Sequence, residues 1–145
     1  MKVLFVCTAN SCRSQMAEAW ARRLFPAGWE AASAGLVVHP IGRRTRAIMA
    51  EVGLDLSEQH PKPIDTFDLD AFDLVVTLSD EAGRYLPTLR DPGRHWRRPI
   101  DDPMEATGSP GEVREAFRAG RRRAGAIVVE VLAAYGCDPG TGVVS

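Results

Sequence analysis

A cysteine and an arginine stand six positions apart near the start of the chain, in the stretch Cys7-Thr8-Ala9-Asn10-Ser11-Cys12-Arg13-Ser14. Backbone N–H groups of a short loop that leads into a helix bind anions. A guanidinium adds a planar fork of donors that suits a tetrahedral oxyanion. A cysteine in so positive a setting is expected to be a thiolate and therefore a nucleophile. The spacing predicts attack by Cys7 on an oxyanion held by Arg13.

The residues on either side of this loop predict a strand before it and a helix after it. The apolar run Val3–Val6 leads straight into Cys7, as a buried strand would. After Arg13, apolar residues recur at the spacing of one helix face: Met16, Ala17, Trp20, Ala21 and Leu24. In the alternative, Cys7 is an inert cysteine at a strand end and Arg13 a surface charge. Strand, polar loop and helix signals together favour an anion-binding loop.

The pattern Cys-x5-Arg-Ser, followed by Gln15-Met16-Ala17-Glu18, resembles the phosphate-binding loop of the low-molecular-weight protein tyrosine phosphatases. More closely, it resembles the arsenate reductases built on the same scaffold, and the resemblance extends to about Tyr135. It implies that Cys7 is the nucleophile and that Arg13 clamps the oxyanion. It also implies an oxyanion-binding loop made of Thr8, Ala9, Asn10, Ser11 and Cys12. Ser14 is implied to hydrogen-bond the Cys7 thiolate, with an N-terminal helix cap as its alternative role.

A general acid is expected in Asp101-Asp102-Pro103, because the leaving oxygen must be protonated. Proline restricts the backbone of the residue before it. In the family the acid is the Asp before Pro, so the resemblance selects Asp102 over Asp101. The alternative is a solvated acidic turn.

The resemblance also implies a candidate site for an ion. Asn10, Glu18, Ser33 and Asp65 match positions that hold potassium in some arsenate reductases of this fold. Such oxygen ligands suit a hard cation. Equally, the four side chains hydrogen-bond one another without an ion. No other cofactor is expected.

Thioredoxin-linked arsenate reductases carry two further cysteines after the third strand, and residues 75–87 contain none. Their intramolecular disulfide relay is therefore excluded here. Cys12 is the redox candidate, either as a partner for a Cys7 disulfide or as a small apolar filler. Reduction would otherwise draw on an external thiol from thioredoxin, glutaredoxin or a low-molecular-weight thiol.

Three functions remain open. The first is a thiol-dependent arsenate reductase. The second is a phosphatase that hydrolyses phosphotyrosine or small phosphate esters through a phosphocysteine. The third is a non-catalytic anion-binding module, which the presence of Cys7, Arg13 and Asp102 disfavours.

Composition excludes several other classes of function. The 145 residues carry 18 Lys and Arg against 19 Asp and Glu, so no nucleic-acid or anionic-membrane partner is indicated. There is no apolar run of the roughly 20 residues that a membrane span needs, and no signal peptide is recognisable. Three cysteines do not make a disulfide scaffold, which favours the cytoplasm. We expect one catalytic domain over 1–136 and a loose tail over 137–145.

Strand and helix patterns alternate along the chain, which predicts a parallel α/β fold. Strands are expected at 1–7, 30–33, 74–78 and 95–99, and helices at 14–25, 43–52 and 112–135, with a helical turn near Phe67. The resemblance implies four parallel strands in flavodoxin-like order, with helices on both faces. The carboxyl ends of the strands would bring Cys7, Ser79 and Asp102 to one cleft. Arg121-Arg122-Arg123 is expected on a solvated helix face.

Overall fold

Four parallel strands form a single sheet in the computed structural model, which describes residues 1–137. The strands are β1 (Lys2–Cys7), β2 (Glu30–Gly35), β3 (Leu74–Thr77) and β4 (His95–Arg97), and their order across the sheet is β2-β1-β3-β4. Central β1 pairs with β2 from Lys2↔Glu30 to Cys7↔Gly35 and with β3 from Val3↔Leu74 to Val6↔Thr77. The predicted parallel α/β fold and the flavodoxin-like order are confirmed.

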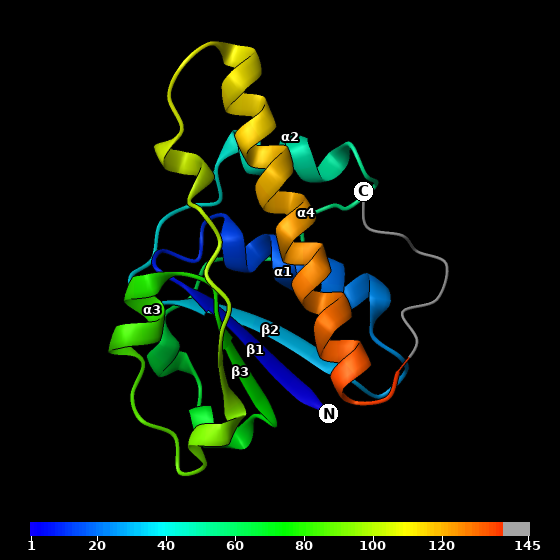
Figure 1. Cartoon of the computed structure of the whole chain (residues 1–145), viewed down its shortest axis with the longest axis vertical. Coiled ribbons are helices and arrows are strands. Elements are labelled where there is room, and N and C mark those ends of the chain that lie inside the picture. The colour runs from blue at the N-terminus through cyan, green and yellow to red at the C-terminus, as the bar shows by residue number, and fades with distance from the viewer. Residues whose placement is uncertain (138–145) are drawn as a thin grey trace.

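The helices are α1 (Arg13–Leu24), α2 (Arg43–Ala50), α3 (Asp80–Tyr85) and α4 (Pro110–Ala134). Between α2 and β3 the chain makes only two short 3₁₀ turns, Ile64–Thr66 and Leu69–Ala71, on either side of Phe67. Two more, Pro92–Arg94 and Pro103–Glu105, flank β4 and the acidic Asp-Asp-Pro segment. Figure 1 shows α4 crossing the molecule beside α1, with the amino terminus and the end of α4 at the same end of the sheet.

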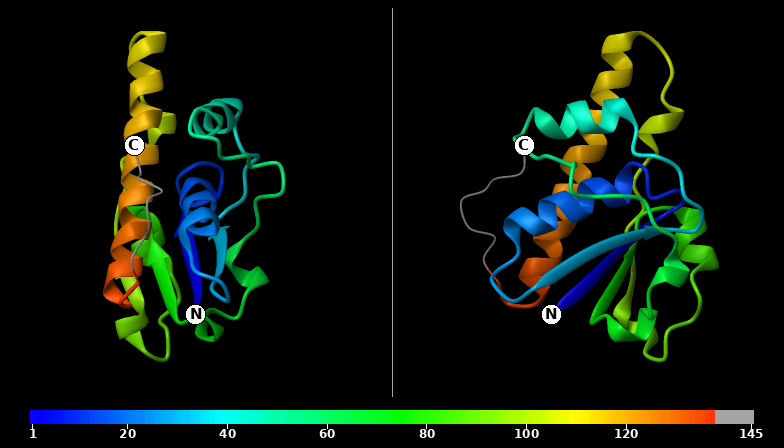
Figure 2. Two further views of the ribbon diagram at one scale, coloured as in Figure 1. Left: turned by 90° about the vertical axis from the view of Figure 1, so that its right-hand side faces the viewer. Right: turned by 180° about the vertical axis from the view of Figure 1, so that it is seen from behind.

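Residues alternate along β1 between two apolar clusters, one on each face of the sheet. Val3, Phe5 and Cys7 pack in the cluster that includes α1, α2 and α4. Leu4 and Val6 pack in the smaller cluster with α3 and the segment around Phe72. Figure 2 shows α4 along one side of the molecule, beside α1. Because β1 is buried on both faces, its end at Cys7 is held firmly in the centre of the fold.

The predicted element boundaries shift by a few residues. The fourth strand ends at Arg97 and not Pro99, and α2 ends at Ala50, two residues before the predicted end. Helix α4 begins at Pro110 because Ser109 and Glu112 form a reciprocal capping box, and proline is favoured at the first helical position.

The expectation of a solvated Arg121 is wrong. Its side chain is buried, and Nη1 donates to Ile48 O at 2.8 Å and to Glu51 Oε1 at 2.8 Å. An arginine is buried when its charge is paired in this way.

The predicted tail begins at Cys137, whose N–H donates to Leu132 O; its remaining residues, 138–145, lie outside the described residues. Among the helices described, none is long and apolar enough to span a membrane.

Candidate active site

The loop between β1 and α1 combines an unusual backbone conformation with backbone donors that have no protein partner in the described part of the chain. Asn10 has φ 52°, the left-handed conformation that non-glycine residues rarely adopt. In the described part of the chain, the backbone N–H groups of Thr8–Cys12 donate to no protein acceptor. Free donors at the start of a helix are suited to bind the anion that the spacing predicts.

Cys7 lies at the base of this loop, 2 % exposed, with Sγ 2.8 Å from Ser14 Oγ. Ser14 Oγ also accepts from Asn10 Nδ2 at 2.7 Å. Because the Asn10 amide nitrogen can only donate, the single Ser14 proton is directed at the sulfur, where it stabilises negative charge. This contact fits the role that the resemblance implies for Ser14, whereas the helix N-cap is Cys12, which makes no side-chain cap bond.

Arg13 joins the loop to the acidic segment. Its Nη1 donates to Ile100 O at 3.1 Å, and its Nη2 lies 3.4 Å from Asp102 Oδ2. Asp102 is 25 % exposed and also caps the next 3₁₀ turn by accepting from Met104 N. Asp101 is exposed. The structure thus brings Cys7, Arg13 and Asp102 to one end of the sheet, with Asp102 the carboxyl paired to the clamp.

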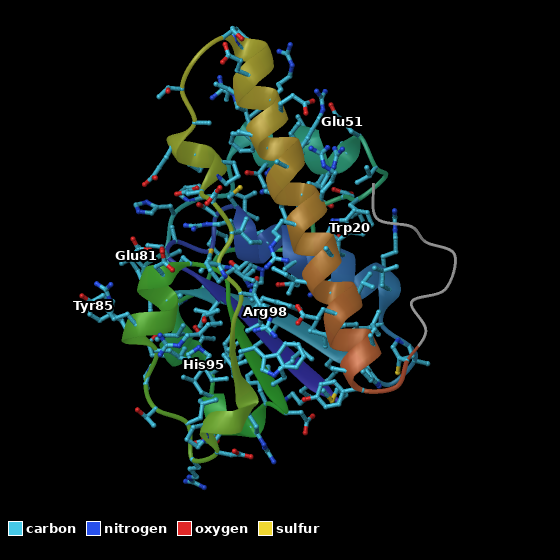
Figure 3. The ribbon with its side chains drawn as sticks, viewed as in Figure 1. Trp20, Glu51, Glu81, Tyr85, His95 and Arg98 are labelled. Atoms are coloured by element: carbon cyan, nitrogen blue, oxygen red, sulfur yellow. The ribbon has the colours of Figure 1, made fainter. Side chains whose placement is uncertain are left out.

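A cavity of about 260 Å³ opens over Thr8 and Arg13. None of the described residues that line this cavity is aromatic, and five of them are carboxylates: Asp80, Glu81, Asp101, Asp102 and Glu105. Glu81 Oε2 accepts from Thr8 Oγ1 at 3.3 Å, and a hydrogen bond at its own backbone lowers its pKa. Figure 3 shows Glu81 at the start of α3, beside the end of β1. Ser79 meets the loop as expected, 3.0 Å from Thr8 Oγ1.

Cys12 differs from Cys7. Its side chain is 3 % exposed, and burial raises the pKa of the Cys12 thiol to about 12. In the folded loop it is therefore a protonated filler and not a nucleophile at neutral pH. Cys137 follows the end of α4, at the opposite end of the sheet from Cys7 (Figure 1).

Three of the four residues of the proposed ion site meet in a buried cluster. Asn10 Nδ2 donates to Ser33 Oγ at 3.0 Å, and Ser33 Oγ donates to Glu18 Oε1 at 2.6 Å. Arg22 pairs with the other Glu18 oxygen at 2.7 Å. Asp65 is exposed and makes no hydrogen bond to the other three in the described chain. The carboxylate already has a cation and Asn10 turns its amide nitrogen inward, so the cluster fits the hydrogen-bonded alternative better than a potassium site.

Two residues that support the loop, Gly35 and Lys62, lie outside the Cys-x5-Arg motif and were not predicted as site residues. Gly35, at the end of β2, leaves no room for a side chain: a Cβ there would lie 2.7 Å from Asn10 N. Lys62 N donates to Asn10 Oδ1 at 2.9 Å. The glycine at the end of the predicted strand is a signal in the sequence for close approach of another backbone segment, whereas nothing in the local sequence indicates the role of Lys62.

Comparison with known proteins agrees with this geometry. The sequence profile of the low molecular weight phosphotyrosine protein phosphatases matches residues 2–123. An arsenate reductase of Halalkalibacterium halodurans is 40 % identical over 125 residues, covering 85 % of this chain and 88 % of that protein. An arsenate reductase of Bacillus subtilis is 40 % identical over 112 residues, covering 76 % and 79 % of the two chains.

Among solved structures, an arsenate reductase in the phosphate binding state superposes with a TM-score of 0.76 at 32 % identity, covering 92 % of this chain and 97 % of that one. A low molecular weight protein tyrosine phosphatase from T. tengcongensis superposes with a TM-score of 0.76 at 24 % identity, covering 92 % and 99 %, which shows the shared fold.

Proposed function

The chain belongs to the low-molecular-weight phosphotyrosine protein phosphatase family of enzymes, and we propose that it acts as a thiol-dependent arsenate reductase. The observation that carries this proposal is the mouth of the cavity. None of the described residues that line this cavity is aromatic, so a phosphotyrosine ring finds no stacking partner there, whereas a small inorganic oxyanion needs only the loop donors and Arg13. The 40 % identity to arsenate reductases supports the same choice.

The first step joins cysteine to arsenic. The Cys7 thiolate attacks hydrogen arsenate held by the loop N–H groups and Arg13. The bond from arsenic to the arsenate hydroxyl breaks, and Asp102 gives its proton to that hydroxyl, which leaves as water. A cysteine-bound arsenate remains. Arg13 and the loop donors stabilise the charge that develops on the oxygens.

The second step needs a thiolate from outside the chain. That thiolate attacks Cys7 Sγ and forms a mixed disulfide, while the electron pair of the sulfur–arsenic bond passes to arsenic, which leaves as arsenite. A second external thiol then reduces the mixed disulfide. Cys12 is buried and protonated, and Cys137 lies at the far end of the sheet, so we assign this role to thioredoxin, glutaredoxin or a low-molecular-weight thiol.

Phosphatase activity is the second candidate. The observation that favours it is Asp102, which stands 3.4 Å from Arg13 and can protonate the oxygen of a departing ester as well as that of arsenate. Cys7 would then carry a phosphoryl group that water removes.

One assay separates the two activities. Purified protein and its Cys7→Ser variant are tested for arsenite release with dithiothreitol, glutathione, thioredoxin and glutaredoxin, and for hydrolysis of phosphotyrosine peptides and nitrophenyl phosphate. We expect Cys7-dependent arsenite release with at least one donor and only slow ester hydrolysis. Efficient phosphotyrosine hydrolysis without arsenite release from any donor would assign the protein to the phosphatases.

The buried Asn10–Ser33–Glu18 cluster predicts a salt response. Because Arg22 already neutralises Glu18, we expect turnover in potassium chloride and in choline chloride at equal ionic strength to agree within about twofold. Arsenite release over a potassium titration measures this. A saturable activation by potassium would restore the ion-site alternative.

A further inference from the structure

Two buried glutamines connect an irregular surface segment to the anion loop. Gln59 is 6 % exposed, and its Nε2 donates to Gln15 Oε1 at 2.9 Å and to Gln15 O at 3.0 Å. Gln15 is fully buried, and its own Nε2 donates to Asn10 O at 3.0 Å. The hydrogen bonds therefore run in one direction, from Gln59 through Gln15 to the main chain of Asn10.

Asn10 is the residue of the loop that most needs external support. Its left-handed backbone is sparsely populated for a residue with a side chain, and such a conformation persists only when its surroundings hold it. The Gln15 bond fixes its carbonyl, and the Lys62 bond fixes its side-chain oxygen. Asn10 in turn orients Ser14, which contacts the Cys7 sulfur.

The segment that supplies these contacts is irregular up to its junction with the sheet. Residues 57–62 form no helix or strand, Gly35 N donates to Lys62 O at 2.9 Å, and Pro63 makes an isolated parallel bridge with Gly35. Gln59 N donates to Leu56 O at 3.0 Å, and the side chain of Leu56 is 2 % exposed in the core. The segment is thus anchored at one end in the core while Gln59 and Lys62 reach the loop.

We propose that Gln59 and Gln15 are positioning residues for oxyanion binding. Their amide relay holds Asn10 in the left-handed conformation, and this keeps the loop N–H groups turned toward the oxyanion and Ser14 turned toward Cys7. Without the Gln59 donor, the Gln15 amide is free to rotate and the Asn10 carbonyl loses its fixed partner. The loop then samples conformations in which its N–H groups diverge, and oxyanion affinity falls.

The test measures binding of inorganic phosphate by calorimetry, since the inference rests on the proposed oxyanion binding but not on the reaction that follows. Gln59→Met keeps the side-chain length and removes the donor. We expect its dissociation constant for phosphate to rise about tenfold, the scale of leaving a buried polar partner unsatisfied. Gln15→Met should have a similar effect, and the double variant should be little worse than either single one, because all three break the same relay.

A second background separates positioning from mere stability. Glycine adopts a left-handed backbone without support, so in Asn10→Gly the further change Gln59→Met should alter phosphate affinity less than about twofold. Leu54→Ala, a core variant close in sequence to Gln59, is the control for lost stability. It should lower the melting temperature and leave phosphate affinity unchanged. If Gln59→Met does not fold, Gln59→Leu, which is uncharged and also lacks a donor, takes its place.

The inference is wrong if the Gln59 variant binds phosphate as the wild type does, if Leu54→Ala loses as much affinity, or if the loss is equally large in the Asn10→Gly background. Wild-type protein that does not bind phosphate at all would contradict both this inference and the proposed function, whereas wild-type binding with an unaffected Gln59 variant contradicts the inference alone.

Discussion

Asp101 and Asp102 are chemically identical neighbours, and their different positions favour Asp102 as the proposed acid. Asp102 Oδ2 lies 3.4 Å from Arg13 Nη2, whereas Asp101 is exposed. We expect Asp102→Asn to lower the rate of arsenite release, and that of phenyl phosphate hydrolysis, by ~10²-fold, the usual contribution of a general acid. Nitrophenyl phosphate should suffer less, because its leaving oxygen needs little protonation.

Asp101→Asn is the matched control, one residue away and with the same loss of charge. Steady-state turnover on the two esters compares the variants. If Asp101→Asn shows the leaving-group dependence and Asp102→Asn does not, the acid has been assigned to the wrong residue.

We expect the two loop cysteines, Cys7 and Cys12, to take different roles when the protein is oxidised. Mild peroxide should oxidise Cys7 to a sulfenic acid, which Cys12 then converts to a disulfide with loss of water. Since Cys12 is buried and its pKa is raised to about 12, formation of the Cys7–Cys12 disulfide requires the loop to open and should be slow. A dithiol should restore activity.

Peptide mass mapping of wild type and Cys12→Ser after peroxide measures this outcome. We expect a crosslinked loop peptide in the wild type and faster irreversible loss of activity in Cys12→Ser. Sulfonic acid on Cys7 without a crosslink, and equal sensitivity of both proteins, would leave Cys12 as a filler.

At the scale of elements, one glycine in α4 lets the acidic segment pack against the helix. A Cβ on Gly120 would lie 2.9 Å from Pro103 Cγ, and Pro103 follows the proposed acid directly. Gly120→Ala gains up to about 1 kcal/mol of helix propensity but must displace this proline. We therefore expect normal or near-normal melting with a severalfold lower turnover, most marked for phenyl phosphate.

Gly111→Ala, in the first turn of the same helix, is the control because the nearest atoms to its Cβ lie at 3.9 Å. It should leave turnover unchanged. Equal turnover in Gly120→Ala and the wild type would show that the contact does not position Asp102.

Across the whole molecule, ion pairs fasten α2 to α4. Glu51 accepts from Arg118 Nη2 and from Arg121 Nη1, each at 2.8 Å, and Figure 3 shows it beside α4. Bonds from Arg118 and then Arg121 lower the Glu51 pKa from 4.5 to about 2. A carboxylate whose pKa is depressed by folding stabilises the protein above its unfolded pKa, and this contribution is lost as the pH falls from about 4.5 toward 2.

Glu51→Gln should therefore melt at a lower temperature than the wild type at pH 7, and the gap should narrow steadily below pH 4.5. Thermal unfolding at several pH values measures it. Glu58→Gln removes an exposed glutamate that forms no ion pair within the described chain, and it should show no such trend. A gap for Glu51→Gln that stays constant down to pH 3 would contradict the assigned linkage.

The sequence by itself determined the features that depend on neighbouring residues. Strand, loop and helix between Met1 and Leu24 follow from local periodicity, and Cys7, Arg13 and Ser14 meet because they share that short unit. The resemblance selected Asp102 as the proposed acid, because it is the Asp that precedes Pro103. The resemblance supplied the strand order, which local patterns do not contain.

Tertiary structure alone decided the contacts between distant segments. Gln59 reaches Gln15 across 44 positions and Lys62 reaches Asn10 across 52, through a segment without regular periodicity. Arg121 is buried because Ile48 O and Glu51 accept its hydrogen bonds, although Arg122 and Arg123, which follow it in the sequence, are exposed. Asp65 stays outside the cluster that its position in the motif suggested. Such placements depend on the path of the whole chain, and no local spacing encodes that path.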